Sequence, residues 1–239
     1  MLTLGAYEKC KRYIESHSKE TQETIRKKEQ FPCITISRQT GAGSYEVSEK
    51  LMKILDAQSK ESEQKWTYFN KELIQKIIED HKLPSIVSNY LAETKYQHLT
   101  DAVYELLGVK PSDWTLLHKT TETILQVARM GKAIIVGRGG NVITSKLPNA
   151  FHVRLVAPLE NRIKHVQEVF GYSKQKAIEY IEKEDKSRRK YLKTHFFRDP
   201  EDPTLYHLIL NTGLLSYQEA AEIIAKALRT KFPGSFKSL

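Results

Sequence analysis

Apolar residues in this chain fall into two patterns, short β-branched runs and longer stretches with helical spacing. The short runs predict strands over residues 33–37, 66–69, 133–136, 151–156 and 205–210. The longer stretches predict helices over residues 45–58, 114–130, 158–169, 173–193 and 217–228, and a further helix after Asn70. Because strands and helices alternate along the chain, we expect an α/β protein with three α/β/α layers around a mostly parallel sheet.

The same pattern divides the chain into one domain with two flanking segments. Residues 1–30 predict an amphipathic helical extension that packs against the domain or a partner subunit. Residues 31–230 form the predicted α/β domain, and residues 231–239 form a tail. Between residues 84 and 109, helical fragments separated by polar residues predict an insertion that lies over the sheet.

Two glycines separate the first predicted strand from the first predicted helix, in the stretch Gly41-Ala42-Gly43. In parallel α/β proteins this turn commonly binds a phosphate, because glycines let backbone N–H groups approach the anion. Against the phosphate-binding motif G-x-x-x-x-G-K-[ST], only the second glycine fits. Arg38, Ser44 and Tyr45 stand at the first glycine, the lysine and the Ser/Thr positions. An ordinary strand-to-helix turn is therefore the alternative.

A second glycine cluster, Gly137-Arg138-Gly139-Gly140, follows the wholly apolar run 133–136. Such a run is typical of an interior parallel strand, and ligands of open parallel sheets bind at the carboxyl ends of the strands. An arginine between glycines offers a planar, permanently charged group to a phosphate. We favour this function over a flexible turn with a solvated arginine.

A third cluster is a run of basic residues before the last predicted strand, comprising Lys186, Arg188, Arg189, Lys190, Lys193 and Arg198. The usual role of such a run is a solvated helix face with ion pairs to Glu182, Glu184 and Asp185. The functional alternative is a lid whose arginines stabilise the charge of a transferring phosphoryl group. The residues alone leave both interpretations open.

Composition bounds the class of protein, its location and its metal sites. The chain has 239 residues with 40% hydrophobic and 28% charged content, which is ordinary for a globular protein. No apolar run is long enough to span a bilayer, and no signal-peptide core is visible. Cys10 and Cys33 form no disulfide framework, so we expect reduced thiols and a cytoplasmic protein. The histidines show no metal-ligand spacing, and no metal site of the protein's own is expected.

The net charge of +9 favours anionic partners. This charge is the one feature that suggests nucleic-acid binding. That function ranks below nucleotide binding because the basic residues are dispersed and no nucleic-acid-binding motif is present.

Taken in order, six stretches resemble the cytidylate kinase-like family, within the nucleoside monophosphate kinase branch of P-loop proteins. They are Ile34–Gly43, Tyr68–Ile74, Ile134–Gly139, Phe151–Arg162, Asp185–Arg189 and Leu210–Ser216. The resemblance implies a parallel five-stranded sheet, an acceptor-binding region over about residues 66–112 and a helical lid over about residues 173–200. It also implies transfer of the γ-phosphoryl group of ATP, with Mg²⁺, to a nucleoside monophosphate such as CMP.

Carried over by position, the resemblance assigns roles to three groups of residues. The donor nucleotide would be bound by Arg38, Gly41, Ala42, Gly43, Ser44, Tyr45 and Arg162. The acceptor would be bound by Asn70, Gly137, Arg138 and Gly139, and the catalytic arginines would be Arg138, Arg188 and Arg189.

Several positions depart from the family pattern. Ser44 stands where typical cytidylate kinases have a lysine, and Tyr45 stands where they have a hydroxyl residue that helps to hold magnesium. Asn70 and Gly139 stand where related sequences have aspartates, so neither can supply a carboxylate. Two hypotheses follow, a phosphotransferase or a catalytically impaired nucleotide-binding regulatory protein on the same fold. The oligomeric state stays open, with a homodimer as one arrangement.

Overall fold

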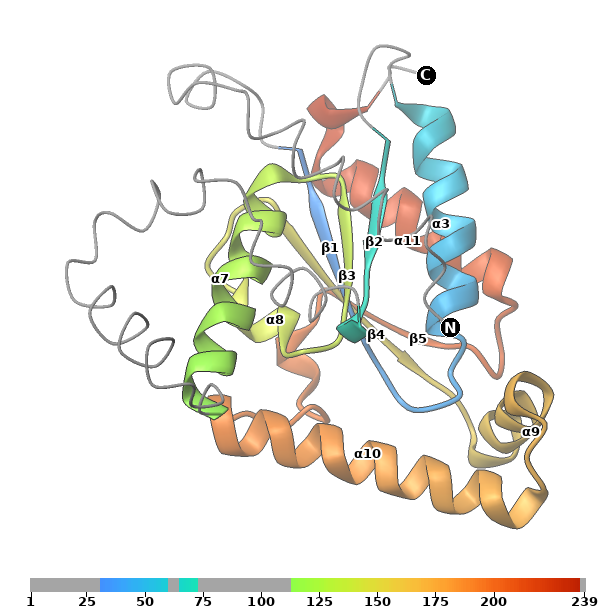
Figure 1. The fold of residues 1–239 in the computed structure, drawn as a ribbon. Coiled ribbons are helices and arrows are strands. Elements are labelled where there is room, and N and C mark those ends of the chain that lie inside the picture. Colours follow the sequence, from blue (N-terminus) through green and yellow to red (C-terminus); the bar gives the residue numbers. More distant parts are fainter. Residues whose placement is uncertain (1–30, 60–64, 73–112, 237–239) are drawn as a thin grey trace.

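The computed structural model describes residues 31–59, 65–72 and 113–236. Its centre is one sheet of five parallel strands in the order β2-β3-β1-β4-β5 (Figure 1). The strands are β1 (Cys33–Arg38), β2 (Thr67–Phe69), β3 (Ala133–Val136), β4 (Ala150–Val156) and β5 (Leu208–Asn211). This confirms the predicted α/β fold with a parallel five-stranded sheet.

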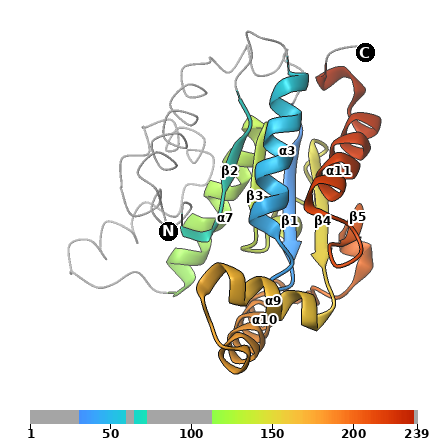
Figure 2. The ribbon, with the colours of Figure 1, turned by 90° about the vertical axis from the view of Figure 1, so that its right-hand side faces the viewer.

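Helices cover both faces of the sheet (Figures 1 and 2). The described helices are α3 (Ser44–Gln58), α7 (Asp113–Met130), α8 (Gly140–Ile143), α9 (Leu159–Phe170), α10 (Lys174–Phe196) and α11 (Tyr217–Lys231), with 3-10 turns at Pro203–Leu205 and Pro233–Ser235. Helices α3 and α11 pack on one face, and α7 and α8 pack on the other.

Alternation along the strands explains the two layers. Ile34 and Ile36 of β1 are buried in the core beneath α3 and α11. Cys33 of the same strand is buried with Ile135 of β3 in the core beneath α7. Because the side chains of an interior strand point alternately to opposite faces, a fully apolar strand is needed where both faces are covered.

Helix α10 lies apart from these layers and crosses the carboxyl ends of the strands (Figures 1 and 2). Its first turns pack on α9 through a separate apolar cluster of Ile163, Val166, Ala177 and Ile181. The helix starts at the predicted place because the Ser173 side chain accepts a hydrogen bond from the Lys176 N–H. This arrangement places the basic run over the edge of the sheet where ligands bind in this fold class.

The largest local difference from the predicted elements is at the last strand. Residues 205–210 were expected to form it, but β5 begins at Leu208. Pro203–Leu205 instead forms a 3-10 turn whose N-cap is Asp202, and the Tyr206 hydroxyl donates to the Pro200 carbonyl. In this turn the Leu205 and Tyr206 N–H groups donate to the Asp202 and Pro203 carbonyls, so they do not pair with a neighbouring strand.

Some expectations lie outside the described residues, namely the helical extension over 1–30, most of the helix after Asn70 and the insertion over 84–109. Within the described ranges, no helix is both long and apolar enough to cross a membrane.

Candidate phosphate-binding site

A cavity of about 250 Å³ lies where β1, β3 and β4 end and α10 crosses above them. Seven cationic and three carboxylate side chains line it. The cations are Arg38, Lys71, Arg138, Arg154, Arg162, Arg188 and Arg189, and the carboxylates are Glu184, Asp185 and Glu201. The cavity is therefore suited to an anionic ligand, because a low-dielectric, concave site strengthens the field of these charges.

The turn between β1 and α3 requires glycine at two places. Gly41 has φ +82° and Gly43 has φ +70°, both in the left-handed region. A Cβ atom on Gly41 would lie 2.6 Å from the Arg162 carbonyl oxygen, and one on Gly43 would collide with the Tyr217 ring. The turn is thus fixed by close packing against α9 and α11.

Ser44 and Tyr45 begin α3 but do not contribute side chains to the cavity lining. The Tyr45 side chain is 60% exposed and packs edge-on against Tyr68, with ring centroids 6.0 Å apart. The turn therefore carries neither the lysine nor the inward hydroxyl of the full P-loop motif. The cations near it come from other elements, Arg162 of α9 and Arg188 of α10.

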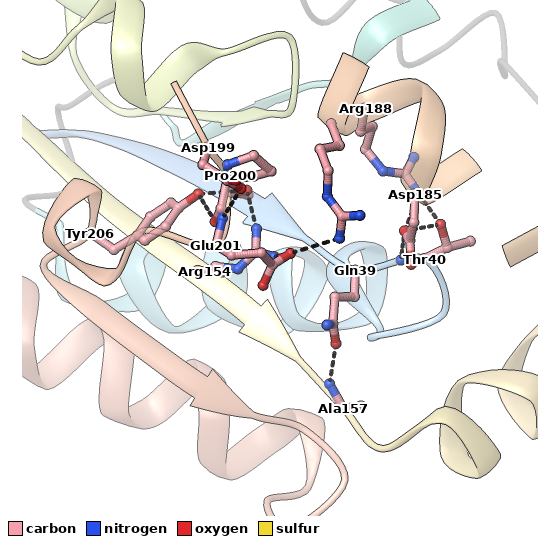
Figure 3. A network of polar contacts seen from close by, with 12 residues as sticks. Gln39, Thr40, Arg154, Ala157, Asp185, Arg188, Asp199, Pro200, Glu201 and Tyr206 are labelled. Carbon is pink, nitrogen blue, oxygen red and sulfur yellow. Dashed lines mark hydrogen bonds and ion pairs between the residues drawn. The ribbon is translucent and has the colours of Figure 1, made fainter. Parts of the chain in front are cut away.

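Asp185 of α10 joins these two arginines to the turn, and Figure 3 shows it beside Thr40 and Arg188. Its Oδ1 accepts hydrogen bonds from the Thr40 N–H at 2.8 Å and from the Thr40 hydroxyl at 2.6 Å. Its Oδ2 accepts from Arg162 Nη1 at 2.7 Å, and Oδ1 also pairs with Arg188 Nη2 at 3.1 Å. The Arg188 Nη2 group in addition contacts the Thr40 hydroxyl.

A second carboxylate, Glu201, holds the other side of the cavity (Figure 3). Its Oε1 lies 2.6 Å from Arg154 Nη2 and 3.8 Å from Arg189 Nη2. Arg154 is only 4% exposed, donates to the Ser37 hydroxyl at 3.1 Å and lies over the Tyr206 ring. The Arg154 charge is thus largely compensated, whereas Arg189 stays at the rim with half of its side chain exposed.

Arg38 and Arg138 differ from the other arginines in lacking such partners. Arg38 makes no hydrogen bond or ion pair with another described residue, and its guanidinium lies against Gly137. Burial, and then repulsion from Arg188, lower its pKa to about 10, so Arg38 still carries its charge at neutral pH. Arg138 lies over the Tyr191 ring at 5.6 Å, and its Nε is buried without a partner within the described ranges.

The structure therefore brings most of the sequence-predicted residues to one place. Arg38, Gly137, Arg138, Gly139, Arg162, Arg188 and Arg189 line the cavity, and the turn of Gly41, Ala42 and Gly43 borders it through Thr40. Asn70 directly follows β2 and is not part of the lining. Tyr45 is not part of the lining either, and its ring packs against Tyr68.

Sequence reasoning did not select Thr40, Arg154, Asp185 or Glu201 as site residues. The pairs Thr40–Asp185 and Arg154–Glu201 are 145 and 47 residues apart in the chain. Asp185 lies in the basic run and was predicted only as an ion-pair partner of that run, which its contact with Arg188 bears out. Periodicity carries no signal for the contacts with the turn.

The described residues fit nucleotide phosphates better than they fit a magnesium ion. Of the three carboxylates in the cavity, Asp185 and Glu201 are bonded to two arginines each, and Glu184 is bonded to Arg188. The tyrosine at the hydroxyl position of the motif faces outward. No group of three or more His, Cys, Asp or Glu side chains suited to a metal occurs in the part of the chain that the structure describes. We therefore derive no step through a protein-bound metal.

Comparison with known proteins decides the family. The profile of the cytidylate kinase-like family matches residues 33–214, which is most of the chain. The chain belongs to the cytidylate kinase-like family. The resemblance based on the six sequence stretches is thereby confirmed. Membership in the cytidylate kinase-like family implies nucleotide binding and typically the use of Mg²⁺.

This cytidylate kinase-like chain is similar to several solved structures. An uncharacterized protein from Eubacterium ventriosum is 19% identical, with a TM-score of 0.61, over 83% of this chain and 99% of that one. A shikimate kinase from Acinetobacter baumannii, in complex with shikimate, is 14% identical, with a TM-score of 0.45, over 87% of this chain and 98% of that one. The likeness to the Eubacterium ventriosum protein shows the fold alone.

A curated relative also matches part of this family member. A uronate isomerase from Corynebacterium glutamicum is 25% identical over 118 residues, which are 49% of this chain and 23% of that protein. The chain thus spans less than a quarter of the length of the curated relative it matches. Its isomerase activity is not carried over to this chain.

Proposed function

We propose that this chain is a phosphotransferase that moves the γ-phosphoryl group of ATP to a nucleoside monophosphate or a similar small phosphorylated acceptor. The observation that carries this proposal is the pair Arg38 and Arg138, two cations that face the cavity without carboxylate partners among the described residues. Buried charges are normally paired. An anionic acceptor would supply the missing partner.

In the proposed reaction an oxygen of the acceptor phosphate forms a bond to the γ-phosphorus, and the bond from that phosphorus to the bridging oxygen of the β-phosphate breaks. The electron pair of this bond leaves with ADP. At neutral pH a phosphate monoester is mostly a dianion, since its second pKa is about 6. Its attacking oxygen carries no proton, so the reaction needs no general base. Asn70 and Gly139 in place of aspartates are compatible with this chemistry.

The donor phosphates are assigned to the turn of Gly41, Ala42 and Gly43 and the start of α3 at Ser44. Arg162 and Arg188 stand beside Thr40 and supply the charge that the absent lysine would give. Magnesium would enter bound to the ATP phosphates, as part of the substrate. Phosphoryl transfer depends mainly on positioning and charge neutralisation, which several arginines can provide.

The acceptor phosphate is assigned to Arg138 and Gly137. The sequence placed Arg38 with the donor, but its contact with Gly137 supports a role toward the acceptor. Arg189 at the rim is assigned to the lid, where closure of α10 would bring it nearer to the transferring group.

A second candidate is a nucleotide-binding protein without catalytic turnover. The bonds between Thr40 and Asp185 favour it, because they occupy groups that would otherwise contact the donor phosphates. Such a protein would bind ATP or CMP and transfer no phosphoryl group.

Thermal unfolding and a coupled assay, both with ATP and magnesium across CMP, dCMP, UMP and AMP, separate the two candidates. Ligand binding to the native state raises the melting temperature by mass action. A shift with turnover supports the phosphotransferase. A shift without turnover supports the non-catalytic binder. The absence of both a shift and turnover contradicts both candidates.

A further inference from the structure

Asp185 receives the set of donors that a phosphate would receive in this place. Thr40 contributes a backbone N–H and a hydroxyl from the turn after β1, and Arg162 and Arg188 contribute guanidinium groups from two helices. Backbone N–H groups of this turn, combined with arginines, are a typical phosphate-binding arrangement. The difference is that the bound anion here belongs to the protein itself.

We propose that Thr40, Arg162 and Arg188 form a polyphosphate-binding site and that the Asp185 carboxylate is its internal, displaceable occupant. The inference rests on the proposed function for the identity of the natural ligand, ATP. Binding of the donor would then require Asp185 to leave the turn, so the carboxylate acts as an autoinhibitory contact between the lid and the turn.

The charges at the site favour displacement by a polyphosphate. Asp185 brings a single negative charge to the donors of Thr40, Arg162 and Arg188, and Glu184 also pairs with Arg188. The Arg188 Nε is also buried without a partner within the described ranges. A triphosphate carries several negative charges and more acceptor oxygens, so it can bond all of these donors at once.

The packing of α10 also permits the change. The buried residues of α10 are Ala177 and Ile181 near its start and Leu192 near its end. Between Ile181 and Leu192 the helix is held over the cavity mainly by polar contacts, among them those of Asp185 with Thr40 and Arg162. The Asp185 side chain is itself 26% exposed, so it can turn toward solvent.

The test measures binding of inorganic tripolyphosphate to the full chain by calorimetry, without magnesium and without an acceptor. We expect Asp185→Asn to bind tripolyphosphate at least tenfold more tightly than the wild type does, because the uncharged amide competes less well than the carboxylate for the donors of the site. Glu201→Gln is the matched control. It removes one negative charge from the same cavity, but away from Thr40, and we expect a gain of less than threefold.

Arg188→Ala extends the test to a variant that retains Asp185. We expect it to weaken tripolyphosphate binding about tenfold or more relative to the wild type, and circular dichroism checks that each variant is folded. Equal binding by Asp185→Asn and the wild type overturns the proposal, as does an equal gain in Glu201→Gln. Unchanged binding by Arg188→Ala overturns it as well.

These outcomes stay separate from the fate of the proposed function. Tighter binding by Asp185→Asn, with no turnover toward any acceptor, supports the proposal that Asp185 is an internal occupant and contradicts the phosphotransferase function. Turnover by the wild type, with no effect of Asp185→Asn on tripolyphosphate binding, supports the phosphotransferase function and contradicts the internal occupant.

Discussion

Thr40 and Asp185 lie 145 residues apart in the chain, yet the carboxylate of Asp185 accepts both the N–H and the hydroxyl of Thr40, at 2.8 and 2.6 Å. The contact joins the turn after β1 to the helix that crosses above it. It explains how a turn without the P-loop lysine comes to have two arginines beside it, since Asp185 also holds Arg162 and Arg188.

Arg38 is predicted to act on the acceptor rather than on ATP. Because its guanidinium lies against Gly137, Arg38→Gln should raise the KM for the acceptor about 10- to 100-fold, the range expected for losing a charged hydrogen bond. The KM for ATP should change less than threefold. Steady-state kinetics with each substrate varied in turn give both values. A larger effect on the KM for ATP would place Arg38 with the donor.

Gly43 is predicted to be intolerant of a side chain. Gly43→Ala should destabilise the fold by about 2 kcal/mol or more, because alanine is strained at positive φ and its methyl group would meet the Tyr217 ring. Urea unfolding measures the loss. The double variant Gly43→Ala/Tyr217→Ala should recover part of it relative to Tyr217→Ala alone. No coupling between the two substitutions would show that the ring does not limit this turn.

Glu46 and His165 are predicted to stabilise the fold most at mildly acidic pH. His165 Nε2 and Glu46 Oε1 lie 3.0 Å apart, and the hydrogen bond that the Glu46 carboxylate accepts raises the pKa of His165 although burial opposes it. Burial has the largest single effect on the pKa of Glu46 and raises it, but the His165 hydrogen bond, a backbone hydrogen bond and the His165 charge together outweigh burial, so the net shift is downward. A histidine whose folded pKa is raised adds stability below its unfolded pKa of about 6.5, and this stability disappears as the pH rises through the folded value.

The variant Glu46→Gln should therefore lose more stability at pH 6 than at pH 8.5, as measured by urea unfolding at both values. Glu49→Gln on the same helix is the control, because Glu49 pairs with Lys53 and not with a histidine. Equal losses by Glu46→Gln at the two pH values would contradict the predicted ion pair.

His152 is predicted to act in the opposite direction. It is 7% exposed, bonds the Thr35 hydroxyl at 2.8 Å and has a pKa lowered to about 4 by burial, then by His207 and Lys231. The unfolded chain therefore binds a proton that the native chain excludes between about pH 6.5 and 4. This linkage should cost the native state about 2 to 3 kcal/mol on acidification through that range.

Urea unfolding of the wild type and of His152→Gln at pH 7 and 4.5 checks this value. Glutamine keeps a hydrogen-bonding group for Thr35 and removes the titration, so the fall in stability should be smaller in the variant. The same fall in both proteins would assign the acid sensitivity to other groups.

Much of the fold could be predicted because its causes are local. Strand β3 is wholly apolar, β1 is mostly apolar, and α10 and α11 start where helical spacing places them, each after a serine N-cap. The place of Arg138 in the cavity lining was predictable because it lies two residues after an interior strand, and the carboxyl ends of parallel strands share one edge. The late start of β5 was missed because Asp202 and Tyr206 stabilise a turn through side-chain bonds that periodicity does not encode.

The inner contacts of the site could not be predicted in the same way. Whether Asp185 faces solvent or Thr40 depends on the direction in which α10 crosses the sheet, which is set by its packing on α9. The sequence left open whether the basic run was a solvated, ion-paired face or a lid. The structure shows Arg188 paired with carboxylates while it also borders the cavity, so the two descriptions are compatible.

The most direct test of the central claim follows the γ-phosphoryl group itself. Purified protein is incubated with ATP labelled in the γ-phosphate, magnesium and each nucleoside monophosphate, and the labelled products are separated. We predict label in a nucleoside diphosphate, reduced at least 100-fold in Arg138→Ala and unchanged in Arg129→Ala, an exposed arginine at the end of α7 outside the cavity. Label that stays in ATP with every acceptor, or transfer that survives Arg138→Ala, would contradict the account.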